Sequence, residues 1–87
     1  MNRSIQVLYF ANLREQLGKD CEVLDVPDTV TNLQSLREWM AGRGDNWAEK
    51  FGDKQKLMAS VNHEMAKPET LLNDGDEIAF FPPVTGG

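Results

Sequence analysis

Residues 73–87 read NDGDEIAFFPPVTGG and hold a turn, a strand and a stop in immediate succession. Asn, Asp and Gly at positions 73–76 tolerate the backbone angles that a tight turn requires. The apolar run at residues 77–81 predicts a strand, which Pro82 and Pro83 end because proline has no N–H for a sheet ladder. We therefore expect a last strand over residues 77–81, followed by a tail over residues 82–87.

The first half of the chain carries two further strand patterns. Residues 4–10, SIQVLYF, are rich in β-branched and aromatic residues, and their lack of clean alternation predicts a strand buried on both faces. Residues 21–26 predict a second strand, and residues 11–17 predict one or two helical turns that end at Gly18. Because the first and last strands are both strongly apolar, we expect them side by side in the centre of one sheet.

The middle of the chain predicts one main helix. It begins at Thr31, where Thr31 and Gln34 form a capping box, and its apolar stripe is Leu33, Leu36 and Met40. Residues 45–56 contain two aromatic residues among charges and are interpreted as a loop with a single helical turn at most. Residues 57–61 predict a short strand, and residues 62–64 predict a turn.

This order predicts an α+β fold of the β-grasp type. One mixed sheet of four to five strands with one main covering helix is the simplest packing of these elements. The domain comprises residues 1–81, and residues 82–87 form a flexible tail.

Composition excludes several partners. The 87 residues carry nine basic and fourteen acidic side chains, and a net charge of −5 repels nucleic acid. One cysteine excludes an internal disulfide, and no stretch reaches the roughly 20 apolar residues of a membrane span. We expect a cytoplasmic protein with neither nucleic acid nor a membrane as a partner.

The chain offers little chemistry of its own. His63 is the only histidine, so no nitrogen and sulfur metal cluster is expected, and an exposed turn histidine is the better interpretation. Cys21 is interpreted as a partly buried structural thiol. The sequence has no phosphate-binding loop and no nucleophile elbow, so we expect no catalytic site and no bound cofactor or metal.

The tail is the remaining candidate. Pro82 and Pro83 favour an extended conformation that projects from the sheet, and Gly86 and Gly87 provide a tip without side chains. Such a tip fits a narrow channel in a partner, where the terminal carboxylate of Gly87 is open to attack. The residues thus indicate a projecting carboxylate that can be activated.

The end of the last strand predicts a partner surface. If Ile78 and Phe80 point into the core, alternation places Ala79 and Phe81 on the opposite face. The alternative is that the fold itself covers both faces. The predicted partner-binding residues are Ala79, Phe81, Pro82, Pro83, Val84, Thr85 and Gly86.

These residues resemble a known family, the small sulfur-carrier subunit of molybdopterin synthase, within the ubiquitin-like β-grasp superfamily. The resemblance covers nearly the whole chain, and residues 43–56 add little to it. It is carried by residues 5–18, VLYFANLRE at residues 7–15 in particular, by residues 57–62, and most specifically by DGDEIAFFPPVTGG at residues 74–87.

The resemblance implies a function for the tail. An adenylyltransferase related to ubiquitin-activating enzymes would use ATP to adenylate the Gly87 carboxylate, and a sulfur donor would convert it to a thiocarboxylate. The tail would then enter the large catalytic subunit, in a heterotetramer, and donate sulfur to cyclic pyranopterin monophosphate during molybdenum cofactor biosynthesis. The catalytic groups would belong to that subunit.

Two other functions stay open at this point. A carrier for thiamine synthesis or tRNA thiolation would use the same chemistry with another acceptor. A ubiquitin-like modifier or interaction module would use the tail to form an isopeptide bond, or not at all.

Overall fold

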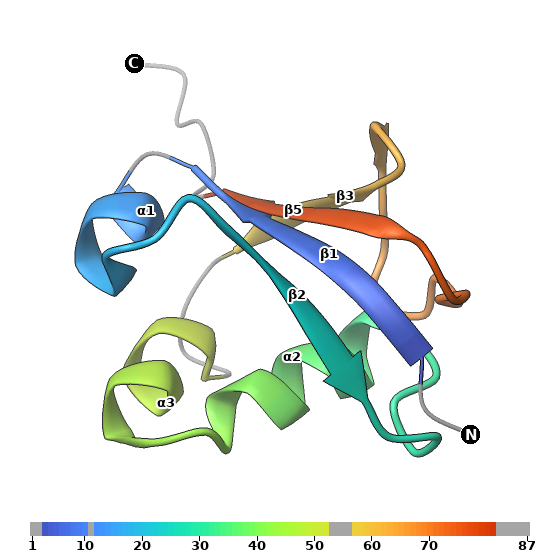
Figure 1. Cartoon of the computed structure of the whole chain (residues 1–87), viewed down its shortest axis with the longest axis horizontal. Helices are drawn as coiled ribbons and strands as arrows, with labels where there is room; N and C mark the ends of the chain where they lie inside the picture. The colour runs from blue at the N-terminus through green and yellow to red at the C-terminus, as the bar shows by residue number, and fades with distance from the viewer. Residues whose placement is uncertain (1–2, 11, 53–56, 82–87) are drawn as a thin grey trace.

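The computed structural model describes residues 3–10, 12–52 and 57–81, and it shows one mixed sheet with helices packed on one face (Figure 1). The tail that the sequence predicts, residues 82–87, lies outside the described residues. In chain order the elements are β1 (Arg3–Tyr9), α1 (Asn12–Leu17), β2 (Cys21–Val26), α2 (Leu33–Ala41), α3 (Asp45–Phe51), β3 (Met58–Val61), β4 (Glu64–Met65) and β5 (Glu77–Phe81).

The sheet has the strand order β2-β1-β5-β3-β4, so the last strand lies at its centre. β5 pairs in parallel with β1, its neighbour from the other end of the chain, and antiparallel with β3. β2 and β4 are antiparallel additions at the two edges. The predicted α+β fold and the predicted adjacency of the first and last strands are both confirmed.

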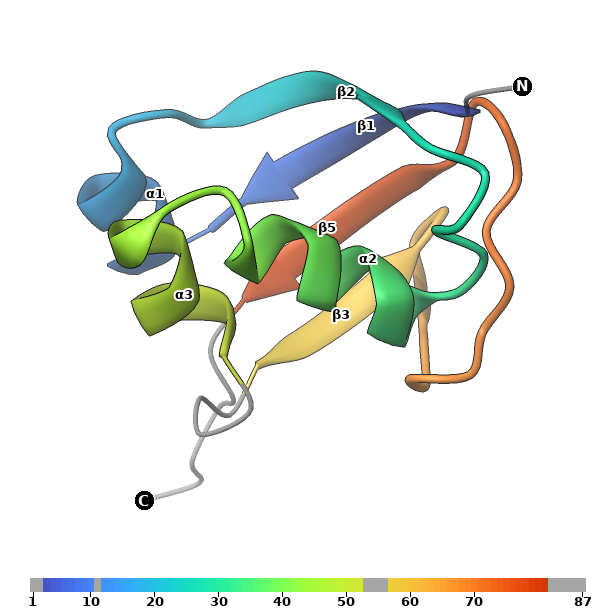
Figure 2. The same cartoon turned by 90° about the horizontal axis from the view of Figure 1, so that it is seen from below.

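One face of the sheet is buried under α2 and α3, which Figure 2 shows on the near side of the strands. The core residues on β1 are Ile5, Val7 and Tyr9, each at most 1% exposed. Between them, Ser4 and Gln6 are exposed and Leu8 is half-buried. The prediction that this strand is buried on both faces was therefore wrong, because only one face of the sheet carries helices among the described elements.

The main helix begins one residue later than predicted. Its N-cap is Asn32, whose side chain accepts a hydrogen bond of 2.8 Å from the Ser35 N–H, while the Ser35 hydroxyl accepts one of 3.0 Å from the Asn32 N–H. This reciprocal pair replaces the predicted box of Thr31 and Gln34, since Asn and Ser provide the same two side-chain acceptors.

The apolar stripe of the main helix is confirmed. Leu33, Leu36 and Met40 are all buried beneath the sheet. Burying three large side chains on one face is what holds so short a helix in place.

A second helix lies where the sequence predicted a loop. α3 has Trp47 and Phe51 four residues apart, which places both rings on one helical face. Phe51 is 1% exposed and lies edge-on to Phe80, with ring centroids 5.1 Å apart. Arg37 of α2 donates hydrogen bonds of 3.0 and 2.8 Å to the carbonyls of Phe51 and Gly52, so it satisfies the end of α3.

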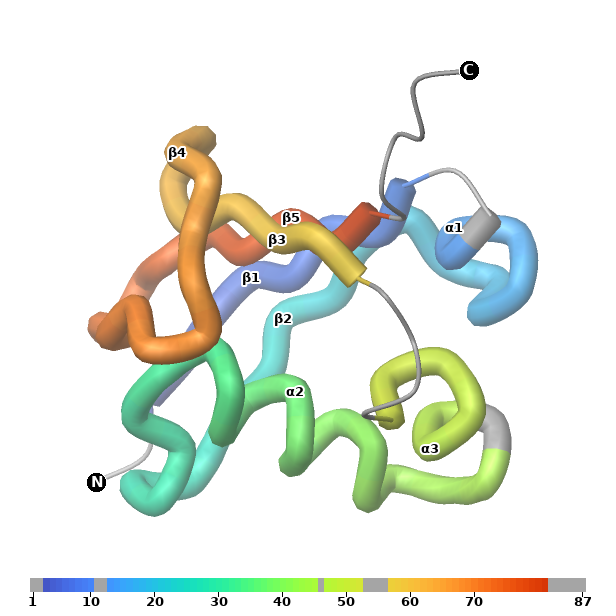
Figure 3. The backbone as a smooth tube through the Cα atoms, turned by 180° about the vertical axis from the view of Figure 1, so that it is seen from behind, coloured from blue at the N-terminus to red at the C-terminus, as the bar shows by residue number. Residues whose placement is uncertain are grey.

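Two turns have the backbone angles that their residues predict. Asn62 and His63, between β3 and β4, have φ values of 52° and 71°, and the right-handed twist of a two-residue hairpin favours such left-handed positions. Gly75, in the turn before β5, has a φ of 87°. Figure 3 shows how the first of these turns brings β4 back beside β3.

Candidate functional site

The sheet face opposite the helices carries the two described residues of the predicted partner surface. Strand register places Leu8 of β1 and Ser60 of β3 on either side of Ala79. Met58 lies in the same way opposite Phe81. Directly opposed residues in a sheet share a face, so these side chains form one surface, which we call the outer face.

The outer face is hollowed along β5, and both apolar and polar side chains line the hollow. A hollow of about 300 Å³ lies there. Its lining residues are Leu8, Phe10, Ser60, His63, Met65, Glu77, Ala79 and Phe81. Ala79 forms the floor and is only 8% exposed, whereas Phe10 and Met65 are 45% and 61% exposed. Exposed apolar side chains gathered around a hollow are typical of a protein-binding surface.

One side of the hollow is polar. The His63 Nε2 atom lies 3.5 Å from the Glu77 Oε1 atom, and the His63 side chain is 84% exposed. The prediction of an exposed turn histidine is thus confirmed. A histidine and a carboxylate at the rim suit polar contacts around an apolar centre.

Cys21 also lies on the outer face. It stands opposite Leu8 in the register of β1 and β2, and its side chain is exposed. The prediction of a partly buried thiol was wrong, because Cys21 occupies an outward position of an edge strand whose inward positions are held by Leu24 and Val26.

The other predicted site residues, Pro82, Pro83, Val84, Thr85, Gly86 and Gly87, lie outside the described residues. The structure does place their point of attachment, since β5 ends at Phe81 beside the hollow. Sequence reasoning missed Leu8, Phe10 and Met65 as parts of the surface. The polar residues Ser4 and Gln6 were the available signal, because Leu8 and Phe10 continue their spacing of two along the same strand.

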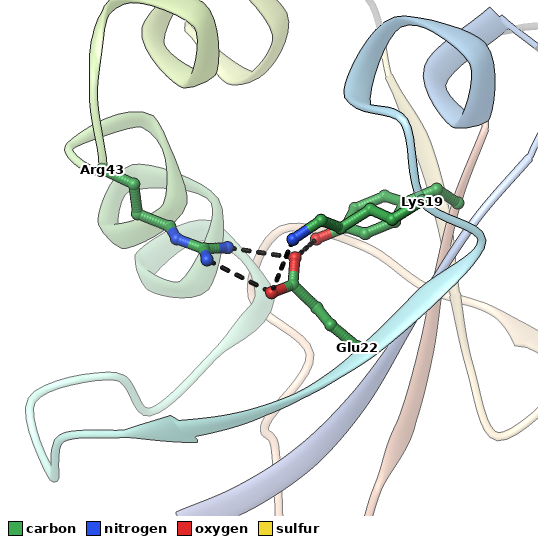
Figure 4. Close-up of polar contacts among 4 residues, drawn as sticks. Lys19, Glu22 and Arg43 are labelled. Atoms are coloured by element: carbon green, nitrogen blue, oxygen red, sulfur yellow. Dashed lines mark hydrogen bonds and ion pairs between the residues drawn. The ribbon is translucent and has the colours of Figure 1, made fainter.

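A second polar feature lies on the covered side of the sheet, and Figure 4 shows three of its residues, Lys19, Glu22 and Arg43. The Arg43 guanidinium donates two hydrogen bonds to the Glu22 carboxylate, at 3.1 and 3.2 Å. The Tyr9 hydroxyl donates a third, at 2.6 Å, and the Lys19 ammonium lies 3.7 Å away. We call these four residues the carboxylate cluster.

The carboxylate cluster shifts the pKa values of its members. Burial raises the pKa of Glu22, but the hydrogen bonds from Arg43 and Tyr9 outweigh it and hold the pKa below its usual range. Burial, with the hydrogen bond to Glu22, raises the pKa of Tyr9 well above its usual value. Glu22 is therefore charged and Tyr9 neutral at physiological pH.

The carboxylate cluster is a structural anchor. Arg43 also lies over the Trp47 ring, 4.1 Å from its centroid, so the cluster ties the link between α2 and α3 to β2. Tyr9 is paired in register with Phe80 of β5. Through Tyr9, the carboxylate cluster thus holds the end of β5 in place, and β5 ends beside the hollow of the outer face.

Two further features bear on chemistry within residues 3–10, 12–52 and 57–81. No group of three or more His, Cys, Asp or Glu residues there is placed to hold a metal ion. No helix in this part of the chain is long and apolar enough to cross a membrane.

Comparison with known proteins places this geometry in a family. The model of the ThiS family matches residues 7–87. The chain is 45% identical over 83 residues to the molybdopterin synthase sulfur carrier subunit of Escherichia coli, covering 95% of this chain and 99% of that protein.

Solved structures share the fold. The crystal structure of SAMP1 from Haloferax volcanii has a TM-score of 0.75 and 29% identity, covering 97% of this chain and 99% of that one. A chain in the complex of subunits 1 and 2 of the molybdopterin-converting factor from Helicobacter pylori has a TM-score of 0.64 and 22% identity, covering 97% and 99%. The predicted β-grasp class and the resemblance to sulfur carriers are confirmed, and the chain belongs to the ThiS family.

Proposed function

We propose that this chain is the sulfur carrier subunit of a molybdopterin synthase, with Gly87 as the carrier residue. The observation that carries the proposal is the extent of the family match, which runs through the tail to Gly87, together with the identity to the E. coli subunit over nearly its whole length. The outer face supports it, because it provides an apolar docking surface at the base of the tail.

The proposed chemistry takes place at the C-terminal carboxylate. A carboxylate is a poor electrophile, so a partner adenylyltransferase transfers AMP from ATP to Gly87 and releases pyrophosphate. A sulfur donor then displaces AMP and leaves a thiocarboxylate, whose ionised sulfur is the nucleophile. This sulfur is donated to cyclic pyranopterin monophosphate. Because a dithiolene contains two sulfur atoms, two thiocarboxylated carriers act for each molecule of product.

The chain itself contributes binding and delivery. In the proposed heterotetramer, the large catalytic subunit docks on the outer face through Ala79, Phe81 and their neighbours, and Pro82 to Gly86 lead Gly87 into its active site. The adenylyltransferase uses the same carboxylate in a separate complex. The chain holds no cofactor of its own in this proposal, and its place of action is the cytoplasm.

Intact-mass analysis of protein co-expressed with its adenylyltransferase tests the carrier role. A species in which one oxygen has become sulfur is expected, and a C-terminal peptide isolated by digestion should carry the change. The variant lacking Gly87 should not form it. If the active adenylyltransferase leaves the full-length chain unmodified, the proposal is wrong.

A pair of matched variants tests the docking surface. Phe10→Asp places a charge at the hollow, whereas Ser4→Asp places the same charge on the outer face at the opposite end of β1. Burying an unpaired charge is costly, so Phe10→Asp should weaken binding to the large subunit by at least about tenfold. Equal effects of the two variants would contradict docking at the hollow.

A second candidate function is that of a ubiquitin-like modifier. It is favoured by the likeness to SAMP1, whose name is small archaeal modifier protein 1. Covalent conjugates of the chain to lysine side chains in cell extracts, absent for the Gly87 deletion, would support it. Reconstitution with thiazole-forming or tRNA-thiolating acceptor enzymes tests the remaining carrier roles.

A further inference from the structure

The sulfur-containing side chains are unevenly distributed between the two faces of the sheet. Three methionines lie in the described residues, and Met40 is fully buried in the core at 0% exposed. Met58 and Met65 are 39% and 61% exposed. Register places Met58 opposite Phe81 and Met65 opposite Ser60, so both lie on the outer face.

We propose that Met65 and Met58 are oxidation sites through which peroxide reversibly switches off docking at the outer face. The inference rests on the proposed function, because it concerns the surface that we assign to the large subunit. In the reaction the thioether sulfur takes one oxygen atom from hydrogen peroxide, the sulfur is oxidised to a sulfoxide, and the peroxide is reduced to water.

Because Met65 and Met58 lie on the outer face, their oxidation changes the binding surface and leaves the buried core unmodified. Met65 lies in the two-residue edge strand β4 and lines the hollow with Ala79 and Phe81, so its oxidation adds a dipole to an apolar surface. Neither Met58 nor Met65 belongs to the buried core, whose methionine among the described residues is Met40. A sulfoxide buried against an apolar partner without a hydrogen bond weakens binding by about tenfold or more.

The experiment compares the carrier before and after treatment with hydrogen peroxide. Peptide mapping is expected to show one added oxygen at Met65 first, then at Met58, with Met40 unmodified while the protein stays folded. Binding to the large subunit, measured by calorimetry, should then weaken about tenfold or more. Methionine sulfoxide reductase should restore it.

Three variants separate this switch from other effects of peroxide. In the double variant Met58→Leu/Met65→Leu, affinity should be the same before and after treatment, whatever its starting value. Met65→Gln carries a polar group of similar shape and should reproduce the loss without peroxide. Cys21→Ser removes the exposed thiol on the same face, and its response to peroxide should match that of the unmodified sequence.

The outcomes are distinct. Failure of the untreated carrier to bind the large subunit overturns the proposed function, and the switch with it. Normal binding by the untreated carrier, followed by equal binding after Met65 and Met58 are oxidised, overturns the switch alone. A loss of binding that persists in the double leucine variant assigns the effect to another residue and also overturns it.

Discussion

Replacing Arg43 with alanine removes the cation that donates two hydrogen bonds to Glu22 in the carboxylate cluster. Its two hydrogen bonds to Glu22, at 3.1 and 3.2 Å, join side chains that are 26% and 15% exposed, so solvent screening limits their contribution to about 1–2 kcal/mol. The contact with Trp47 at 4.1 Å adds about 0.5–1 kcal/mol. We expect Arg43→Ala to lower the free energy of unfolding by about 2 kcal/mol at pH 7.

Thermal and urea unfolding followed by circular dichroism measure this loss. For a chain of this size about 2 kcal/mol corresponds to a fall in Tm of roughly 10 °C. The matched control is Lys67→Ala, which removes an exposed cation outside the cluster and should change stability by less than about 0.5 kcal/mol.

A double-mutant cycle with Glu22→Gln decides whether the stabilisation comes from the pair. A neutral amide oxygen accepts a weaker hydrogen bond from Arg43 than the Glu22 carboxylate does, so removing Arg43 should cost less in this background, with a coupling energy of about 1 kcal/mol or more. If Arg43→Ala costs the same in both backgrounds, the pairing with Glu22 does not stabilise the fold and the reasoning is refuted.

The remaining predictions concern the core, the turn before β5 and pH. Phe51→Ala should lower the free energy of unfolding by about 3–5 kcal/mol in urea titrations, since Phe51 is 1% exposed. A loss under about 1 kcal/mol would show that α3 is not part of the core. Asp76→Ala should lower the free energy of unfolding by about 2 kcal/mol in the same assay, because the buried carboxylate accepts hydrogen bonds of 3.0 Å from the Asn62 side chain and 2.8 Å from the Asn73 N–H. An effect no larger than that of Glu69→Ala, at an exposed position, would contradict this. Glu22 has a lowered pKa in the folded state, so it adds to the free energy of unfolding above the pKa of an unfolded glutamate, and this stabilisation is lost as pH falls through the folded pKa. In Glu22→Gln, the free energy of unfolding should therefore depend less on pH in the acidic range. Tyr9 has a raised pKa in the folded state, so it adds to the free energy of unfolding below about pH 10, and this stabilisation is lost as pH rises above that value. In Tyr9→Phe, the free energy of unfolding should therefore depend less on pH in the alkaline range.

Much of the fold was predictable because its strands carry strong local signals. Residues 21–26 and 77–81 are bounded by turn residues and prolines, and both strands have the predicted bounds. The helix stripe of Leu33, Leu36 and Met40 was equally clear, whereas the exact cap was not, since Thr31, Asn32 and their partners offer two overlapping capping boxes.

α3 could not be predicted because its stability is tertiary. A seven-residue helix is marginal in isolation, and Asp45–Phe51 has no strong helix stripe apart from Trp47 and Phe51. The helix forms because Phe51 packs against Phe80 and Tyr9 from strands distant in sequence, and because Arg37 satisfies its last carbonyls.

The outer face was half predictable. Alternation along β5 assigned Ala79 and Phe81 to the face opposite Ile78 and Phe80, and the register confirms this. The contributions of Leu8, Phe10 and Met65 depend on which strands are neighbours, and strand order is a property of the whole fold.

The central place of β5 has a consequence for the folding of the domain. Glu77–Phe81 joins β1 to β3, so without it the described strands form only two separate pairs, β1 with β2 and β3 with β4. The contacts that close the sheet span most of the chain, and such non-local contacts form late in folding. A chain that lacks β5 would therefore have no strand to join the two halves of the sheet, and the outer face would be divided between them.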